Sequence, residues 1–344
     1  KVTGVQTCAL PISERVASKI LRALSLPYQI DGHTLHSTSS IGIAVFPADG
    51  ESVESLMQNA DAAMYHAKSA GRNTVQFFTA SMNQAASDRR QLEEDLHLAL
   101  QQKQFVLHYQ PQVDAGQRVF AVEALLRWQH PRHGLVSPGK FVPLAEDTGL
   151  IVPIGHWVLT TACAQLKAWA GMAQTRELQI AVNVSARQFR QADFVEVLKQ
   201  VLATSGAEPR RLKLELTESL VLDNVADTIA KMNAIKLLGV TFAMDDFGTG
   251  YSSLSYLTRL PVDQLKIDRA FVSRLPDNQS DAVIAQTIVT MGRSLGLKVV
   301  AEGVENEAQR QFLDGQGCHG YQGFLFSRPL TVEAFEAFLA SARQ

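Results

Sequence analysis

Acidic and amide side chains, with one lysine among them, recur from residue 123 onward at spacings that would let them act together. The residues in this set are Glu123, Asn183, Glu215, Glu218, Asp245, Asp246, Lys266, Asp268, Glu302 and Glu305. Several carboxylates in one pocket would repel one another and take up protons unless a cation lay among them. Carboxylate and amide oxygens suit Mg²⁺ or Mn²⁺ better than zinc, and the nine histidines form no zinc-type cluster. The pattern therefore indicates a divalent-cation site.

The adjacent aspartates suggest what such a site could do. Asp245 could bridge two cations while Asp246 serves the second of them. Two cations about 3.5–4 Å apart stabilise both the attacking and the leaving oxygen of an in-line phosphoryl displacement. Lys266 could orient the attacking water or neutralise charge, and Arg127 could bind a phosphate. The predicted chemistry is hydrolysis of a phosphate ester.

Each of these residues also has a purely structural interpretation. A single acid at the end of a strand is more often a helix N-cap or a surface ion-pair partner. Asp268 beside Arg269 fits a simple ion pair, and Asn183 fits a turn. Glu218 and Glu305 fit supporting roles. Because the residues recur at equivalent ends of consecutive predicted strands, a shared site is the better interpretation.

The elements that must position these residues alternate between short apolar segments and longer amphipathic ones. The predicted strands are 105–113, 119–128, 178–185, 212–216, 241–246, 264–268, 298–302 and 320–326, and the predicted helices include 157–170, 225–238, 280–295 and 305–313. Eight strands with intervening helices predict a (β/α)8 TIM-like barrel, in which function lies at the C-terminal ends of the strands. A doubly wound open sheet is the alternative, but no glycine-rich phosphate fingerprint follows the first strand.

The segment before the barrel has a different order of predicted helices and strands. Residues 14–80 predict a helix capped by Ser13, a buried strand at 36–46, a helix at 52–70 and a further short strand. A polar connection at 79–90 leads into the barrel region, 81–344. Residues 1–13 match none of the patterns found further along the chain. We leave them unassigned and interpret them as a candidate artefact of sequence assembly.

The composition of the chain argues against some classes of function. The chain is 46% hydrophobic and 19% charged, with a formal net charge of −2. This balance argues against a DNA or RNA polymer as partner, because non-specific binding of such a polymer needs a strongly basic surface. No apolar run approaches the ~20 residues that span a bilayer, so we expect no transmembrane segment in this chain. Three widely spaced cysteines predict a reducing compartment, hence a cytoplasmic protein, and no disulfide framework.

Eight motifs, in order, resemble the EAL family of cyclic di-GMP phosphodiesterases. They are YQP at 109–111, EALLRW at 123–128, NVS at 183–185, ELTES at 215–219, DDFGTGYSSL at 245–254, LKID at 265–268, AEGVE at 301–305 and QGFLFSRP at 322–329. The resemblance covers residues 85–344. One EAL triplet would mean little, whereas eight ordered motifs are specific.

The resemblance implies a role for each matching position. One cation would be held by the residues Glu123, Asn183, Glu215 and Asp245. The second would be held by Asp245 and Asp246, with Glu302 nearby. Lys266 would contact the catalytic water, and Glu218 would steady the loop 246–253. The substrate-binding positions are Gln110, Leu126, Arg127, Asp268, Glu305, Gln322 and Phe324, with the last as an aromatic platform for a guanine.

The implied activity is hydrolysis of cyclic di-GMP to linear pGpG with two divalent cations, Mg²⁺ or Mn²⁺. An unsubstituted set of metal positions favours an enzyme over a catalytically silent cyclic di-GMP receptor, and an interaction or dimerising fragment is a third interpretation. The family resemblance also implies a homodimer, formed through helices near the loop 246–253.

The first region resembles the C-terminal half of a GGDEF (diguanylate cyclase) domain. The resemblance lies in SIGIAVFPADG at 40–50 and NADAAMYHAKSAGRN at 59–73. The GGDEF signature itself does not occur in the sequence. We therefore expect a truncated remnant at 14–80 with no cyclase site.

Overall fold

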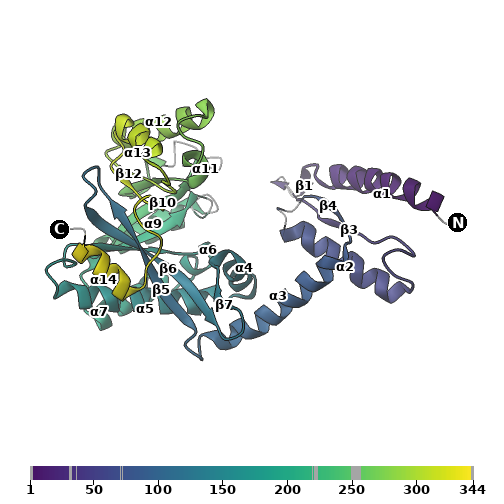
Figure 1. Cartoon of the computed structure of the whole chain (residues 1–344), viewed down its shortest axis with the longest axis horizontal. Helices are drawn as coiled ribbons and strands as arrows, with labels where there is room; N and C mark the ends of the chain where they lie inside the picture. The colour runs from purple at the N-terminus through teal and green to yellow at the C-terminus, as the bar shows by residue number, and fades with distance from the viewer. Residues whose placement is uncertain are drawn as a thin grey trace. The chain divides into compact units, whose positions relative to one another are not determined.

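The computed structural model describes residues 3–30, 33–35, 37–69, 71, 73–218, 220, 224–248 and 257–341. The chain divides into two compact units, Lys1–Asp95 and Leu96–Gln344 (Figure 1). Each unit is described by itself. Among the described residues, no helix combines the length and the apolar character needed to cross a membrane.

The second unit is a closed barrel. Among its described residues, the strands follow one another around the barrel in the order β5 (Phe105–Val113), β13 (Gly320–Tyr321), β12 (Lys298–Ala301), β11 (Gln264–Ile267), β10 (Thr241–Phe247), β9 (Leu212–Thr217), β8 (Gln179–Asn183) and β6 (Val119–His130). Strand β6 pairs with β5 and closes the ring. The predicted barrel fold is confirmed, and its strands lie close to the predicted ranges.

One strand of the barrel runs against the others. Strand β5 is antiparallel to both of its neighbours, β6 and β13. Residues 114–118 join β5 to β6, and a parallel pair would need a crossover of a dozen or more residues. The short connection therefore permits only a hairpin. In its register Gln110 lies opposite Glu123, so two predicted site residues become cross-strand neighbours. A short strand that was not predicted, β7 (Gly134–Val136), extends β6 by a second hairpin.

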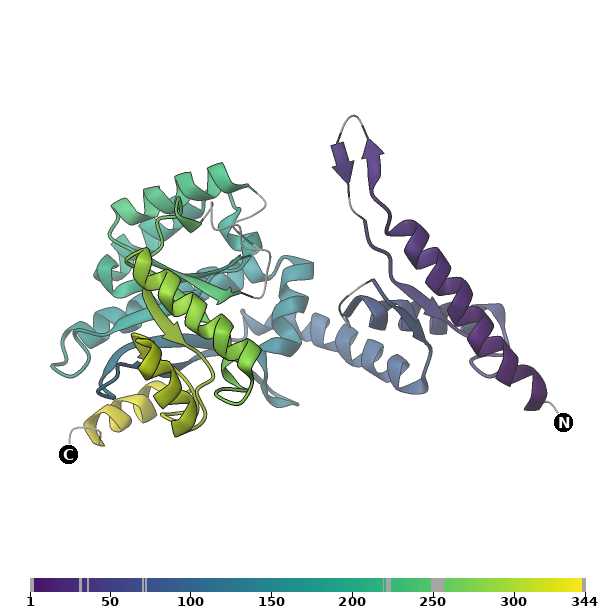
Figure 2. The same ribbon diagram turned by 90° about the horizontal axis from the view of Figure 1, so that it is seen from above.

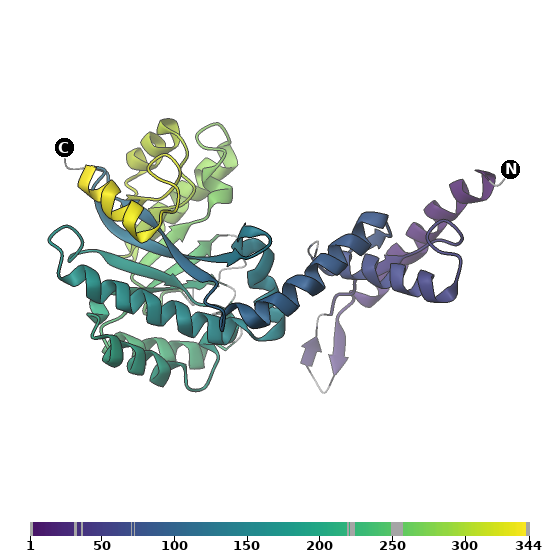
Figure 3. The ribbon, with the colours of Figure 1, turned by 60° about the horizontal axis from the view of Figure 1, so that its bottom comes forward.

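Helices cover the outside of the barrel (Figures 1 and 2). They are α4 (Pro138–Thr148), α5 (Ile151–Ala170), α6 (Ala186–Phe189), α7 (Phe194–Ser205), η1 (Pro209–Arg211), α9 (Val225–Leu237), α11 (Arg269–Val272), α12 (Gln279–Ser294), α13 (Glu307–Gln316) and α14 (Val332–Ser341). Helix α5 lies against strands β5 and β8 and packs beside α7 (Figure 3).

The start of α13 differs from its predicted start at residue 305. The side chain of Asn306 accepts a hydrogen bond from the backbone of Gln309, whose own side chain accepts one from the backbone of Asn306. This capping box satisfies backbone donors that a helix end leaves unpaired. The helix therefore begins at Glu307 and leaves Glu305 outside it, on the segment that follows β12.

The first unit begins with a helix, α1 (Thr3–Leu24), and continues through β1 (Tyr28–Ile30), β2 (His33–Leu35), β3 (Ile41–Ile43), α2 (Val53–Ser69), β4 (Val75–Phe77) and α3 (Ala80–Ala99). Strands β1 and β2 form an antiparallel hairpin that projects beyond the end of α1 (Figure 2). Strands β3 and β4 pair in parallel. The strand predicted at 36–46 is thus reduced to three residues, and residue 36 lies outside the described ones.

Two further predictions in the first unit were wrong. Ser13 does not cap a helix, because α1 begins at Thr3 and continues past both Pro11 and Ser13. Pro11 is the ninth residue of this helix, and a proline inside a helix removes one backbone donor and crowds the preceding turn, so α1 continues at a local cost in stability. The connection predicted at 79–90 is helical as well, as part of α3. Its sequence is polar, but it contains three alanines and two arginines and no Gly or Pro, which favours a helix.

An aromatic cluster packs one end of the barrel against α4. Trp128 on β6 is fully buried, and its ring lies 5.6 Å from that of Phe141 and 6.1 Å from that of Phe105. Its indole nitrogen donates to Gln104 Oε1 at 2.8 Å. The apolar ring of Trp128 is therefore packed in the core, and its one polar atom has a hydrogen-bond partner there.

We expect Trp128→Ala to destabilise the barrel by about 3–5 kcal/mol, because it removes a fully buried aromatic side chain and leaves a cavity. Chemical denaturation followed by circular dichroism measures the change. The adjacent Gln129 is exposed and serves as the control, since Gln129→Ala should change the free energy of unfolding little. Equal stabilities for the two variants would contradict the packing described.

Candidate active site

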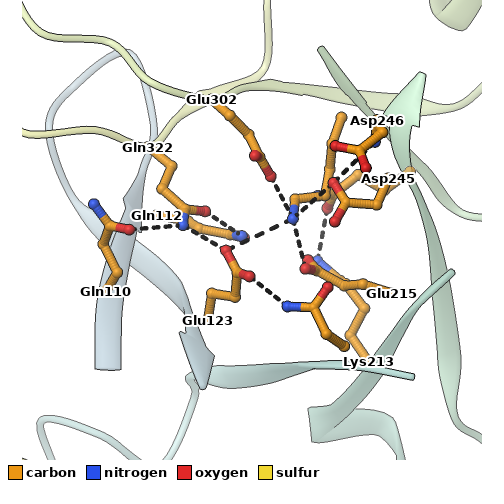
Figure 4. Close-up of polar contacts among 12 residues, drawn as sticks. Gln110, Gln112, Glu123, Lys213, Glu215, Asp245, Asp246, Glu302 and Gln322 are labelled. Carbon is orange, nitrogen blue, oxygen red and sulfur yellow. Dashed lines mark hydrogen bonds and ion pairs between the residues drawn. The ribbon is translucent and has the colours of Figure 1, made fainter. Parts of the chain in front are cut away.

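Lys266 lies at the centre of a cluster of carboxylates inside the barrel. Figure 4 shows the carboxylates of this cluster, which belong to Glu123, Glu215, Asp245 and Glu302. Its ammonium lies 2.5 Å from Glu215 Oε2, 3.1 Å from Asp245 Oδ1 and 3.6 Å from Glu123 Oε2. It also forms an ion pair with Glu302. The five residues come from β11, β9, β10, β6 and the end of β12, so the barrel gathers side chains that are far apart in the sequence.

The charges in this cluster do not balance. Burial alone would lower the pKa of Lys266, but the surrounding carboxylates raise it well above its usual value. Burial raises the pKa of Glu215 to about 8, reinforced by Glu123 and Asp245 and opposed by Lys266. Burial likewise raises the pKa of Glu302, with further repulsion from its acidic neighbours. Negative charge is therefore in excess, which is the condition under which a further cation would be bound.

The chemistry of the side chains fits a divalent cation. Oε1 of Glu215 is buried and has no hydrogen-bond partner, so it offers an unused oxygen donor inside the cluster. Within the described residues, however, no three His, Cys, Asp or Glu side chains stand at the spacing of a preformed metal site. The ammonium of Lys266 occupies the point on which the carboxylates converge, and it sets their present spacing.

A backbone irregularity brings Asp245 and Asp246 to the same region (Figure 4). The pairing of β10 with β11 shifts register between Met244 and Phe247, and Asp246 has a positive φ of 53°. On a regular strand two adjacent side chains would point to opposite faces, whereas a bulge re-aims them. Burial, together with Asp245 and Asp268, raises the pKa of Asp246 to about 6. Both aspartates therefore belong to one electrostatic site.

Glu123 is held by amide side chains on two sides. Asn183 Nδ2 donates to Glu123 Oε1 at 2.6 Å, and Gln322 Nε2 donates to Glu123 Oε2 at 2.6 Å. Gln322 also donates to Gln110 Oε1 at 3.1 Å and accepts from Gln112 Nε2 at 2.9 Å. These bonds fix the orientation of the Gln322 amide and, through it, that of the Glu123 carboxylate.

Glu218 contacts the start of the segment after β10. Its Oε2 accepts a hydrogen bond from the backbone nitrogen of Gly248 at 3.3 Å, and Gly248 has a φ of 96° that favours glycine. Glu218 itself is buried. The rest of the loop that it is predicted to steady, residues 249–253, lies outside the described residues.

A cavity of about 270 Å³ opens beside the carboxylate cluster. Its wall includes Glu123 and Glu302 from the cluster. Among the predicted substrate-binding residues, those that line it are Gln110, Arg127, Glu305, Gln322 and Phe324. Phe324 is 44% exposed, and the guanidinium carbon of Arg328 lies 4.4 Å from its ring centre, over one face of the ring. The structure thus places Glu123 and Glu302 of the cluster and most of the predicted substrate residues at one opening.

Two predicted substrate residues do not line this cavity. Leu126 is replaced in its wall by Leu125, because alternate residues of a strand share a face and Glu123 and Arg127 both face the cavity. Asp268 is the N-cap of α11, and its Oδ1 accepts a hydrogen bond from the backbone of Ala270 at 2.8 Å.

The structure also brings in residues that sequence reasoning missed. Leu125 could have been found from the same alternation. Arg269 lines the cavity, although its position after Asp268 suggested only an ion pair between those two residues. Lys213 is buried two residues before Glu215, and its ammonium donates to Gln264 Oε1 at 2.6 Å. Burial lowers the pKa of Lys213 to about 8.

A family model described as "EAL domain" matches residues 93–329. The chain belongs to the EAL-domain family. A second model, described as "Diguanylate cyclase, GGDEF domain", matches residues 3–74. The acidic cluster, the cavity and Lys266 all lie within the EAL match.

Curated relatives resemble this EAL protein along most of its length. "Bifunctional diguanylate cyclase/cyclic di-GMP phosphodiesterase MucR" from Pseudomonas aeruginosa is 49% identical over 326 residues, which cover 94% of this chain and 47% of that protein. "Cyclic di-GMP phosphodiesterase NbdA" from the same organism is 42% identical, over 95% of this chain and 42% of that protein. The chain thus spans about half the length of the curated relatives it matches.

Solved EAL structures resemble the barrel of this protein. A structure described as "PaMucR Phosphodiesterase, c-di-GMP complex" is 50% identical, with a TM-score of 0.69 over 71% of this chain and 99% of that one. The EAL domain of Mycobacterium smegmatis DcpA is 36% identical, with a TM-score of 0.58 over 69% of this chain and 96% of that one.

We expect Glu215→Gln to gain stability relative to wild type as pH rises, in protein freed of divalent cations. The pKa of Glu215 is about 8 in the folded protein against an ordinary value of 4.5. Between these two pH values, which define the window of the test, the folded wild type keeps a proton that the unfolded chain has released. Wild-type stability therefore falls with rising pH across the window, while a glutamine cannot titrate. Chemical denaturation near each end of the window measures the difference.

The exposed Glu196 provides the control, because Glu196→Gln should show no such trend. If Glu215→Gln and wild type differed by the same free energy at both pH values, the raised pKa of Glu215 would be contradicted.

Proposed function

We propose that this EAL domain hydrolyses one phosphodiester bond of cyclic di-GMP and releases linear pGpG. The observation that carries the proposal is the convergence of Glu123, Glu215, Asp245 and Glu302 on Lys266 beside a ligand-sized cavity. The names of the relatives MucR and NbdA, and a solved MucR complex with c-di-GMP, support cyclic di-GMP as the substrate.

The proposal includes two divalent cations, Mg²⁺ or Mn²⁺. Glu123, Asn183, Glu215 and Asp245 would hold one of them. Asp245 and Asp246 would hold the other, with Glu302 nearby. Bound there, such cations supply Lewis-acid stabilisation of the charge on the attacking and leaving oxygens. The unpartnered oxygen of Glu215 and the raised pKa values of the carboxylates support this assignment.

Side chains of this chain would place the substrate and the water. Arg127 is half-buried in the cavity wall, and its guanidinium can donate two parallel hydrogen bonds to one phosphate. Phe324 offers its ring to a base. The surrounding carboxylates raise the pKa of Lys266, which favours its ammonium form, and in that form it would hold the attacking water by donating a hydrogen bond.

We further propose the domain limits and cellular setting expected from the sequence. The barrel domain would span 81–344, and 14–80 would be a GGDEF remnant without a cyclase site, with 1–13 unassigned. The described cysteines, Cys163 and Cys318, are free and buried, in keeping with a reducing cytoplasm.

We expect Glu123→Ala to abolish hydrolysis of cyclic di-GMP in the presence of Mg²⁺ or Mn²⁺. The change removes a buried carboxylate that touches Asn183, Gln322 and Lys266. Chromatographic separation of cyclic di-GMP from pGpG measures turnover. The exposed Glu196 again provides a matched control, and Glu196→Ala should keep full activity.

The proposal would be overturned if the wild-type protein bound cyclic di-GMP tightly but did not hydrolyse it with either cation. That result would identify the domain as a receptor for the dinucleotide. Neither binding nor turnover would instead favour an interaction fragment.

We also propose a homodimer of the barrel and expect light scattering to give twice the mass of the chain. The predicted interface lies near the loop 246–253, of which 249–253 lie outside the described residues. A single-chain mass at every concentration tested would contradict it.

A further inference from the structure

A second lysine is buried inside the barrel, on the N-terminal side of the carboxylate cluster. Lys213 on β9 is 3% exposed, and Glu215, two residues further along the same strand, is 1% exposed. Alternate residues of a strand share a face, so both side chains point into the barrel (Figure 4). Two residues of a strand span about 7 Å, which places the lysine close to a proposed cation ligand.

The hydrogen-bond partner of Lys213 carries no charge. Its ammonium donates to Gln264 Oε1 on β11 at 2.6 Å. Within the part of the chain that the structure describes, no carboxylate is in ion-pair contact with this ammonium. Lys266, two residues beyond Gln264 on β11, instead contacts every carboxylate of the cluster. The positive charge of Lys213 is therefore not neutralised by a neighbour of its own.

A small residue on the strand between β9 and β11 permits the contact of Lys213 with Gln264. Ala243 on β10 lies between Glu215 and Gln264 in the register of the sheet and is fully buried. Its methyl group leaves room for the lysine to reach across β10. Nε2 of Gln264 is buried and has no hydrogen-bond partner among the described residues, so Lys213 alone orients this amide.

We propose that Lys213 sets how tightly the carboxylate cluster holds divalent cations, by placing an uncompensated positive charge beside Glu215. The ammonium would attract the carboxylates and repel a cation bound among them. It would act through Glu215 without touching the substrate, and it is therefore a positioning residue. The inference rests on the proposed function, since it takes divalent cations as ligands of the cluster, and it adds the residue that limits their affinity.

The direction of a change in affinity separates this role from simple packing. A packing defect loosens a site and weakens the binding of a cation, whereas the loss of a repelling charge strengthens it. Even at the dielectric constant of water, a unit charge and a divalent cation about 7 Å apart repel each other enough to change Kd roughly 10-fold. Tighter binding after removal of the lysine is therefore the result that only the electrostatic role predicts.

The test measures Mn²⁺ binding to wild type and Lys213→Met by isothermal titration calorimetry. It is done at pH 7, below the pKa of about 8 of Lys213, so that the wild-type lysine is charged. Lys213→Met should bind Mn²⁺ roughly 10-fold more tightly than wild type. Added Mn²⁺ should also raise the midpoint of thermal unfolding more in this variant, because a ligand with a lower Kd stabilises the folded state more.

A second variant tests the same charge without removing the lysine. Gln264→Glu keeps the shape of the side chain and places a carboxylate in contact with Lys213, whose charge is then compensated by its neighbour. Mn²⁺ binding should again become tighter. If Lys213→Met does not fold, as thermal unfolding without Mn²⁺ would show, Gln264→Glu decides the inference.

A lysine outside the ring of strands provides the matched control. The side chain of Lys231 on α9 is 14% exposed, and its ammonium pairs with Asp227 at 3.3 Å. Lys231→Met therefore removes a largely buried lysine that lies away from the carboxylate cluster. This variant should leave the Kd for Mn²⁺ unchanged, whatever it does to stability.

The inference would be wrong if either folded variant, Lys213→Met or Gln264→Glu, bound Mn²⁺ no more tightly than wild type. It would also be wrong if Lys231→Met tightened binding equally. Both results leave the proposed function intact when wild type binds Mn²⁺ and hydrolyses cyclic di-GMP. If neither wild type nor any variant bound Mn²⁺, the cation assignment of the proposed function would fail, and the inference would fail with it.

Discussion

The buried ammonium of Lys266 is the interaction on which the rest of the site depends. A barrel interior is ordinarily filled by apolar side chains, and an ionised carboxylate buried there without a partner is costly. Here Glu123, Glu215, Asp245 and Glu302 converge from four directions, and a single fully buried lysine contacts each of them. Without that charge the carboxylates could not remain close together in an ionised state.

The lysine does not neutralise the cluster, and this imbalance links structure to chemistry. The raised pKa values of Glu215, Glu302 and Asp246 show that, without a further cation, these carboxylates tend to take up protons. A folded domain tolerates such strain at a functional site, where a ligand relieves it. This imbalance is the electrostatic condition for the proposed divalent cations, and Lys266 contacts the carboxylates that would hold them.

Barrel closure decides how this cluster meets the substrate cavity. The antiparallel strand β5 sets Gln110 opposite Glu123, and Gln322, at the end of β13, donates to both of them. The amides thus connect the wall of the cavity to a carboxylate of the cluster. At the other side of the cavity, Arg269 pairs with Glu305, whose backbone nitrogen donates to the buried Gln309. The proposed chemistry and the proposed substrate recognition therefore meet at one opening, whose wall includes Gln110 on β5 and Glu123 on β6.

The sequence by itself determined the residue types, their order and the fold that gathers them. Eight motifs with strand and helix periodicity were sufficient to predict the barrel, whereas the antiparallel direction of β5 was not predicted. Leu125, missed in favour of Leu126, follows from strand alternation once Glu123 is taken to face the site. Local patterns extend no further than one element and its immediate neighbours.

Only the tertiary structure decided which residues touch. The contact of Gln322 with Glu123, the central place of Lys266 and the pairing of Arg269 with Glu305 join strands and loops far apart in the chain. The bulge that turns Asp246 toward Asp245 depends on how β10 and β11 pair. Register and closure are set by the packing of the whole core, so no single segment of sequence contains them.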